Sequence, residues 1–119
     1  MSTTQKPIFD TVFFNNITDG DESFKNELID VFISSAQDQL HEIRKAAEEQ
    51  NSNQYGWHSA LHSLKGSCSS IGAIKLSSFI IEHQNKNLDL TKEYKISIYN
   101  DIKSILEETE SEITKEKSN

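Results

Sequence analysis

Apolar residues recur at the spacing of an α-helix through most of this chain, and only short polar segments interrupt them. The sequence has a single proline, at position 7, and four glycines, so few residues disfavour helix after the start. We expect breaks between helices at residues 16–21, 51–53, 69–72 and 85–89. This pattern predicts an all-α fold, an antiparallel up-down four-helix bundle with an additional short N-terminal helix across one end.

The length of 119 residues suits one domain with a single helical core. We expect a disordered N-terminal lead at residues 1–6, a helical bundle domain at residues 7–114, and a frayed C-terminal tail at residues 115–119. The first helix should follow Pro7 and is rich in aromatic side chains. We expect this helix to cap the bundle. Alternatively, part of its edge, such as Phe14, stays exposed as a docking surface.

The charge and composition of the chain limit its partners. A net charge of −7 disfavours nucleic acid, because phosphate backbones are bound by clustered Lys and Arg. The sequence contains no apolar run long enough to cross a bilayer, and its start lacks the hydrophobic segment of a signal peptide. Its one cysteine permits no internal disulfide, in agreement with a reducing compartment. We therefore expect a cytoplasmic protein that binds no nucleic acid and does not insert into a membrane.

The most informative segment is the third predicted helix, which carries residues 57–71. Its apolar residues fall within one narrow arc and predict a buried seam, made of Trp57, Leu61, Leu64, Cys68 and Ile71. His62 lies roughly 140° from the middle of that seam, where the helix should face water. Lys65, Gly66 and Ser69 follow at i+3, i+4 and i+7 on the same face. The helix thus offers an imidazole beside an ammonium group and a position without a side chain.

This combination suits phosphoryl transfer. Histidine has a reference pKa of about 6.5, so a solvent-exposed imidazole is largely unprotonated at cytoplasmic pH and can attack phosphorus without a general base. An ammonium group one helical turn away can stabilise charge on the phosphoryl oxygens. A histidine midway along a rigid helix is also held in place, and precise placement is most of what phosphoryl transfer requires of a protein.

The run His-Ser-Leu-Lys-Gly-Ser at residues 62–67, followed by Gly-Ala at residues 72–73, resembles the signature of histidine-containing phosphotransfer (HPt) domains. These domains are the intermediates of His-to-Asp phosphorelays. Together with the helix pattern, the resemblance covers about residues 8–113. Cys68 stands where the family often has Ser or another small residue, and it should pack equally well on the seam. Gln84 matches a family Gln that lies near the phosphoacceptor in some members.

The resemblance implies a role for each residue of this face. His62 would be the phosphoacceptor, Lys65 would stabilise the phosphoryl charge, and Gly66 would give a partner access. Ser69 and Gln84 would supply hydrogen bonds that orient the imidazole or the phosphoryl group. From the residues alone, Ser69 is equally well explained as a solvated helix residue.

The resemblance also implies partners. The phosphoryl group would come from a phospho-aspartate on a response-regulator receiver domain, downstream of a hybrid or sensor histidine kinase, and would pass to another receiver. The sequence has no Gly-x-x-x-x-Gly-Lys phosphate loop, no kinase glycine-rich loop and no carboxylate cluster adjacent to His62. We therefore expect a phosphocarrier that binds no ATP and has no cofactor of its own, with Mg²⁺ in the receiver domain. We also expect a monomer.

Other interpretations of the same residues are open. The nearest is a phosphoacceptor domain phosphorylated directly by the ATP-binding domain of a histidine kinase, since such domains share a related His-x-x-Lys-Gly core. A non-catalytic helical adaptor would also place a His and a Lys on a solvated face. A metal site at His58 and His62 would need further ligands. The run at residues 41–45 is similar to the phosphoacceptor box of dimeric kinases but lacks its Thr-Pro or Asn-Pro continuation, and His83 fits the edge of the core.

Overall fold

The computed structural model describes residues 7–49, 54–84 and 91–117, and these form five helices. The helices are α1 (Thr11–Thr18), α2 (Glu22–Glu48), α3 (Gln54–Ile71), α4 (Ile74–Gln84) and α5 (Lys92–Thr114). No strand occurs in these three ranges, so the all-α prediction is confirmed for them. The predicted lead at residues 1–6 and the breaks expected at residues 51–53 and 85–89 lie outside the described residues.

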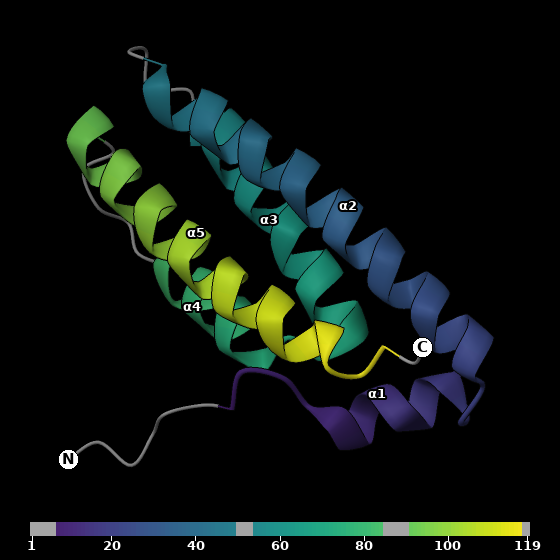
Figure 1. The fold of residues 1–119 in the computed structure, drawn as a ribbon. Coiled ribbons are helices and arrows are strands. Elements are labelled where there is room, and N and C mark those ends of the chain that lie inside the picture. The colour runs from purple at the N-terminus through teal and green to yellow at the C-terminus, as the bar shows by residue number, and fades with distance from the viewer. Residues whose placement is uncertain (1–6, 50–53, 85–90, 118–119) are drawn as a thin grey trace, which may run out of the picture.

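The four longer helices lie side by side and pack in a closed ring (Figure 1). α2 packs against α3 and α5, and α4 packs against the same two helices. α3 and α5 therefore occupy diagonal corners, and the apolar core lies between the four helices. The other helices contribute these large core residues: Ile29, Phe32, Leu40 and Ile43 from α2, Leu76 and Ile80 from α4, and Ile98, Ile102, Leu106 and Ile113 from α5.

The seam predicted for α3 faces this core. All five of its residues are at most 3% exposed. Cys68 is fully buried among them, and burial raises the pKa of its thiol to about 12, because the charged thiolate is disfavoured away from water. Cys68 therefore packs as a small apolar residue, in agreement with the prediction from its place on the seam.

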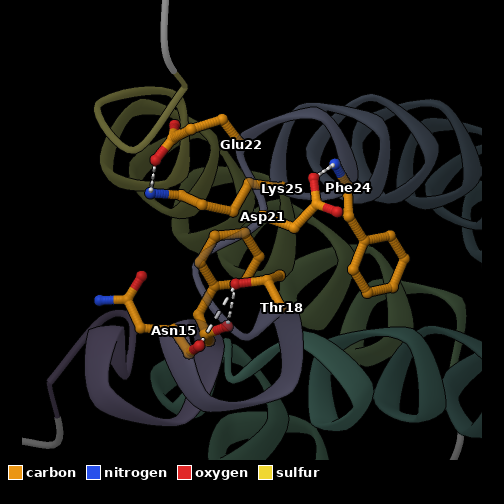
Figure 2. A network of polar contacts seen from close by, with 7 residues as sticks. Asn15, Thr18, Asp21, Glu22, Phe24 and Lys25 are labelled. Atoms are coloured by element: carbon orange, nitrogen blue, oxygen red, sulfur yellow. Dashed lines mark hydrogen bonds and ion pairs between the residues drawn. The ribbon is translucent and has the colours of Figure 1, made fainter.

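Local hydrogen bonds shape the junction between α1 and α2 (Figure 2). Asp21 is the N-cap of α2, and its carboxylate accepts a hydrogen bond from the backbone N–H of Phe24 at 3.0 Å. Asp19 ends α1 in the left-handed conformation, with φ of 52°. Thr18 is buried and donates its hydroxyl to the carbonyl of Phe14 at 2.9 Å. These contacts set the angle at which the chain leaves α1 and enters α2.

The segment before α1 is anchored to the turn between α3 and α4. Asp10 donates its backbone N–H to the carbonyl of Gly72 at 2.8 Å, and its side chain caps α1 by accepting from Phe13 N–H at 3.0 Å. Gly72 has φ of +90°, and a Cβ placed there would lie 3.0 Å from Cδ2 of Phe13. The turn therefore needs glycine both for its backbone conformation and for the close approach of α1.

The alternative in which Phe14 forms an exposed docking edge is wrong. Phe14 is fully buried, and its ring centroid lies 5.3 Å from that of Phe9. The exposed apolar side chains of α1 are Val12, Phe13 and Ile17. The helix begins after the N-cap Asp10 and not directly after Pro7, and the face turned inward is the one that carries Phe14 and Thr18.

α5 contributes a buried cation that the helical pattern did not reveal. Lys95 is 1% exposed, and its ammonium donates to the carbonyls of Ala46 at 3.2 Å and Glu49 at 3.3 Å. It also lies 6.0 Å from the ring centroid of Trp57. The last carbonyls of a helix have no partner within it, and a cation there complements the helix dipole. Lys95 therefore ties α5 to the end of α2.

The residues that follow α5 continue to make contacts. The backbone N–H groups of Glu116 and Lys117 donate to the carbonyls of Ile113 and Thr114 at 2.9 and 3.0 Å. The ammonium of Lys117 lies 2.7 Å from the carboxylate of Asp30 in α2. Both partners are solvent-exposed, so this ion pair contributes little stability. Residues 118–119 of the predicted tail lie outside the described residues.

Candidate functional site

α3 presents His62 to solvent on the side opposite its buried seam. The neighbours Leu61 and Leu64 are buried, so packing of the seam sets the rotation of the helix about its axis. Within the described part of the chain, the imidazole of His62 makes no hydrogen bond or ion pair. Both ring nitrogens are therefore available to an incoming group.

Lys65 lies one helical turn after His62 and is half-buried. Its ammonium forms no ion pair with any described residue. Other lysines of the described chain do pair with carboxylates, namely Lys25, Lys45, Lys75, Lys115 and Lys117. The cation beside His62 is thus free to interact with an anionic group.

Gly66 follows on the same face, and its surroundings are open. A Cβ placed at this position would have no atom of another part of the molecule within 4 Å. Glycine in the middle of a helix is less stable than alanine by roughly 0.5–1 kcal/mol. Neither the packing nor the backbone conformation of this protein explains a glycine at position 66. Contact with a partner molecule would explain it.

Ser69 is exposed on the predicted face, and it makes no side-chain hydrogen bond within the described ranges. Two neighbouring serines, Ser67 and Ser70, do make side-chain hydrogen bonds. Ser67 donates its hydroxyl to Oε1 of Gln39 in α2 at 2.9 Å, and Ser70 donates to the carbonyl of Ser67 at 2.8 Å. The bond between Ser67 and Gln39 connects α3 to α2 close to Gly66. The sequence analysis missed it, because Gln39 lies 28 residues away in the chain.

Gln84 is the last residue of α4 and is half-buried. His62 lies ten residues before Gly72 and Gln84 twelve after it, so each is about 15–18 Å along its helix from the turn. α3 and α4 are neighbouring helices that pack against each other. Gln84 follows the buried Ile80 of α4 by one helical turn.

His83 belongs to a different stripe of α4. Lys75, Phe79 and His83 are spaced four residues apart, and Lys75 forms an ion pair of 2.8 Å with Glu108 of α5, so this stripe faces α5. Nδ1 of His83 donates to the carbonyl of Phe79 at 2.9 Å, and the two rings lie 4.1 Å apart. His83 is thus a half-buried residue at the edge of the core, about 100° around α4 from Gln84.

An open groove of about 490 Å³ lies between α2 and α3, and its lining includes Ser63, the residue that follows His62. Its α3 wall consists of small residues, Gly56, Ser59, Ala60 and Ser63, and its α2 wall includes Gln39, Glu42 and Lys45. Glu42 and Lys45 pair with each other at 3.8 Å.

The remaining histidines do not gather around His62 in a metal site. His58 lies one turn before it and is half-buried, and His41 is exposed on α2. The described residues contain no group of three or more His, Cys, Asp or Glu side chains that could hold a metal ion. Among the described helices, none combines the length and apolar character needed to cross a bilayer.

A search with protein-family models matches the Hpt domain over residues 27–112, more than half of the chain. The chain belongs to the HPt domain family. Neither a curated protein nor a solved structure matched it. HPt domains carry phosphoryl groups on histidine in two-component phosphorelays, where they interact with receiver domains and kinases. The match includes all of α3 and α4, and therefore the whole exposed face around His62.

Proposed function

We propose that His62 is the phosphoacceptor of this HPt domain, and that the chain takes a phosphoryl group from a receiver phospho-aspartate and passes it to another receiver. The observation that carries this proposal is the exposed imidazole on α3, which makes no hydrogen bond or ion pair with described residues, with a free cation and an open glycine in the following turn. The family match includes this segment.

In the proposed step, the unprotonated ring nitrogen of His62 attacks the phosphorus atom of the phospho-aspartate. A P–N bond forms while the P–O bond to the aspartate breaks, and the electron pair of that bond stays with the aspartate carboxylate. The proton on the other ring nitrogen is free to leave to solvent. The reverse reaction with a second receiver passes the group on. The chain holds the nucleophile in place, which supplies much of the catalysis of such a transfer.

We assign supporting roles to the neighbours of His62. Lys65 stabilises the negative charge of the phosphoryl oxygens, as cationic side chains do in other phosphoryl-transfer sites. Ser69 and Gln84 supply hydrogen bonds that orient the imidazole or the phosphoryl group. Gln84 fits this role because it is the half-buried last residue of α4, which packs against α3.

The proposal extends to the fold, the partners and the location. The packing ring and the short connections favour an antiparallel up-down bundle with α1 across one end, formed by residues 7–114. We propose a cytoplasmic monomer without ATP or a cofactor of its own, which works with response-regulator receivers and a hybrid or sensor histidine kinase. Mg²⁺ would be held by the receiver.

We further propose that α1 takes part in receiver docking. Val12, Phe13 and Ile17 are exposed apolar side chains, and Phe13 approaches Gly72 at the end of α3. Exposed apolar side chains that gather on a small surface often mark a protein interface. The role first considered for Phe14 thus passes to its neighbours on the outer face of α1.

A transfer experiment tests the main proposal. The purified chain is mixed, without ATP, with a radiolabelled phosphorylated receiver, and we expect acid-labile label on the chain that a second receiver then removes. A parallel reaction contains the ATP-binding domain of a histidine kinase and ATP. If the kinase domain labels the chain and the phosphorylated receiver does not, the chain is a phosphoacceptor domain that a kinase phosphorylates directly. If neither donor labels the chain, it is a non-catalytic adaptor.

A side chain at Gly66 is expected to obstruct the partner and not the fold. Gly66→Gln should slow transfer from the receiver roughly tenfold or more, because small displacements of reacting groups have large effects on rate. Phosphorylation by phosphoramidate, a donor small enough to avoid the side chain, should change by less than about twofold. Gly66→Ala is the matched control and should have a smaller effect on receiver transfer. Equal losses with both donors would contradict a steric docking role.

A further inference from the structure

A side-chain hydrogen bond joins α3 to α2 near the level of the site. The hydroxyl of Ser67 donates to Oε1 of Gln39 at 2.9 Å, and both side chains are half-buried. Ser67 follows His62 by five residues, which places it about 7.5 Å farther along α3 and about 140° around the helix. Ser67 therefore faces α2, away from the solvent side of α3 that carries His62.

The outer boundary between α2 and α3 is poorly filled on both sides of this bond. The groove of about 490 Å³ extends along residues 56–63 of α3, and a smaller hollow of about 100 Å³ extends along residues 67–71. Gln39 lines the groove and Ser67 lines the hollow. The hydrogen bond thus crosses the boundary at the point where the two openings meet.

The buried seam and this hydrogen bond restrain different movements of α3. The seam sets the rotation of α3 about its axis, because its apolar side chains pack into the core. Side chains that interlock across the outer boundary would oppose a tilt of α3 away from α2. The α3 wall of the groove has only small residues, so few side chains interlock there. The bond between Ser67 and Gln39 opposes this tilt in their place.

We propose that Gln39 and Ser67 are positioning residues, which hold α3 at a fixed distance from α2 so that His62 meets the phosphorus atom of a docked receiver. The inference rests on the proposed function, in which the receiver docks on α1. Because α1 packs against α2, a receiver bound there is placed relative to α2, whereas the phosphoacceptor is on α3. A misplacement of about 1 Å between reacting groups can lower a rate by about 100-fold.

The test compares two phosphoryl donors. A receiver reaches His62 from its docking position, whereas phosphoramidate needs to meet only His62 and its neighbours on α3. Ser67→Ala and Gln39→Met each remove the hydrogen bond, and Met has about the length of Gln. Ser67→Thr keeps the hydroxyl and is the conservative variant. Ser70→Ala is the matched control, because the hydroxyl of Ser70 donates to the carbonyl of Ser67 at 2.8 Å within α3.

The measurement is single-turnover transfer from a receiver that phosphorylates the wild-type chain. For Ser67→Ala and Gln39→Met we expect the maximal rate constant to fall roughly three- to tenfold, with the half-saturating receiver concentration changed by less than about twofold. The double variant should lose no more than either single variant, since both remove the same bond. Ser67→Thr and Ser70→Ala should stay within about twofold of wild type, as should phosphorylation of every variant by phosphoramidate.

Other results would overturn the inference. A higher half-saturating concentration at an unchanged maximal rate would indicate that Gln39 or Ser67 contacts the receiver directly. Equal losses with both donors would place the effect on His62 itself, and a lower melting temperature with unchanged rates would indicate a purely structural role. Losses that multiply in the double variant would show that the two residues act independently. A wild-type chain that no receiver phosphorylates would overturn the proposed function itself, a result visible before any variants are compared.

Discussion

Replacement of His62 by Gln is expected to lower phosphoryl uptake from a phosphorylated receiver by at least about 100-fold, because the amide lacks the nucleophilic ring nitrogen. The fold should be unaffected. The side chain is exposed and makes no hydrogen bond or ion pair with described residues, so the free energy of unfolding should change by less than about 0.5 kcal/mol. Acid-labile label on the chain reports the uptake, and circular dichroism with thermal melting reports the fold.

His41→Gln is the matched control for this experiment. His41 is also an exposed histidine in the middle of a long helix, but it lies on α2. We expect this variant to take up label at the wild-type rate. Label retained by His62→Gln and lost from His41→Gln would place the phosphoacceptor on α2 and reject the assignment to α3. If both variants retain the label, the phosphoacceptor would be His58 or His83.

Gly72→Ala should destabilise the protein, because the added methyl group is unfavourable both for the backbone conformation and for the packing at this position. A residue other than glycine at φ of +90° is strained by roughly 1–3 kcal/mol. The new Cβ would also lie 3.0 Å from the Phe13 ring and 3.3 Å from the carbonyl oxygen of Asp10. We expect a loss of about 3 kcal/mol in the free energy of unfolding, measured by urea denaturation. The melting temperature should fall by roughly 10 °C.

Gly66→Ala is the control for the stability measurement. The same methyl group there meets no atom within 4 Å, in the middle of α3, so we expect a gain of roughly 0.5–1 kcal/mol. The two glycines thus predict shifts of opposite sign from the same chemical change. A Gly72→Ala protein as stable as wild type would show that the close approach of α1 to the α3–α4 turn contributes nothing to the fold.

Periodicity alone was sufficient to predict the buried side of α3. The five seam residues lie within one arc of the helix, and packing in a bundle selects that arc because it is the only continuous apolar face. The exposure of His62 follows from the same geometry, since a residue opposite a buried seam must face outward. The conformation of Gly72 was also foreseeable, because a helix end followed closely by another helix favours a left-handed residue.

Contacts between distant segments were not predictable in this way. Lys95 has a polar head that pattern analysis assigns to water, yet it is buried because its ammonium caps the carbonyls of Ala46 and Glu49. The orientation of α1 depends on the bond from Asp10 to Gly72, so the inward face carries Phe14 and not its neighbours. In the site, the hydrogen bond between Ser67 and Gln39 joins α3 to α2, and the sequence alone does not predict which residues of these two helices lie next to each other.

The burial of Cys68 has a practical consequence for spectroscopy. Thiol-reactive dyes attack the thiolate, and a buried thiol with a pKa of about 12 is almost never in that form at neutral pH. A cysteine introduced on the solvent side of α5 would therefore be the single reactive position, without removal of the native residue from the core. A fluorophore attached there would sit at the corner diagonal to α3 and would report receiver binding without covering the histidine face.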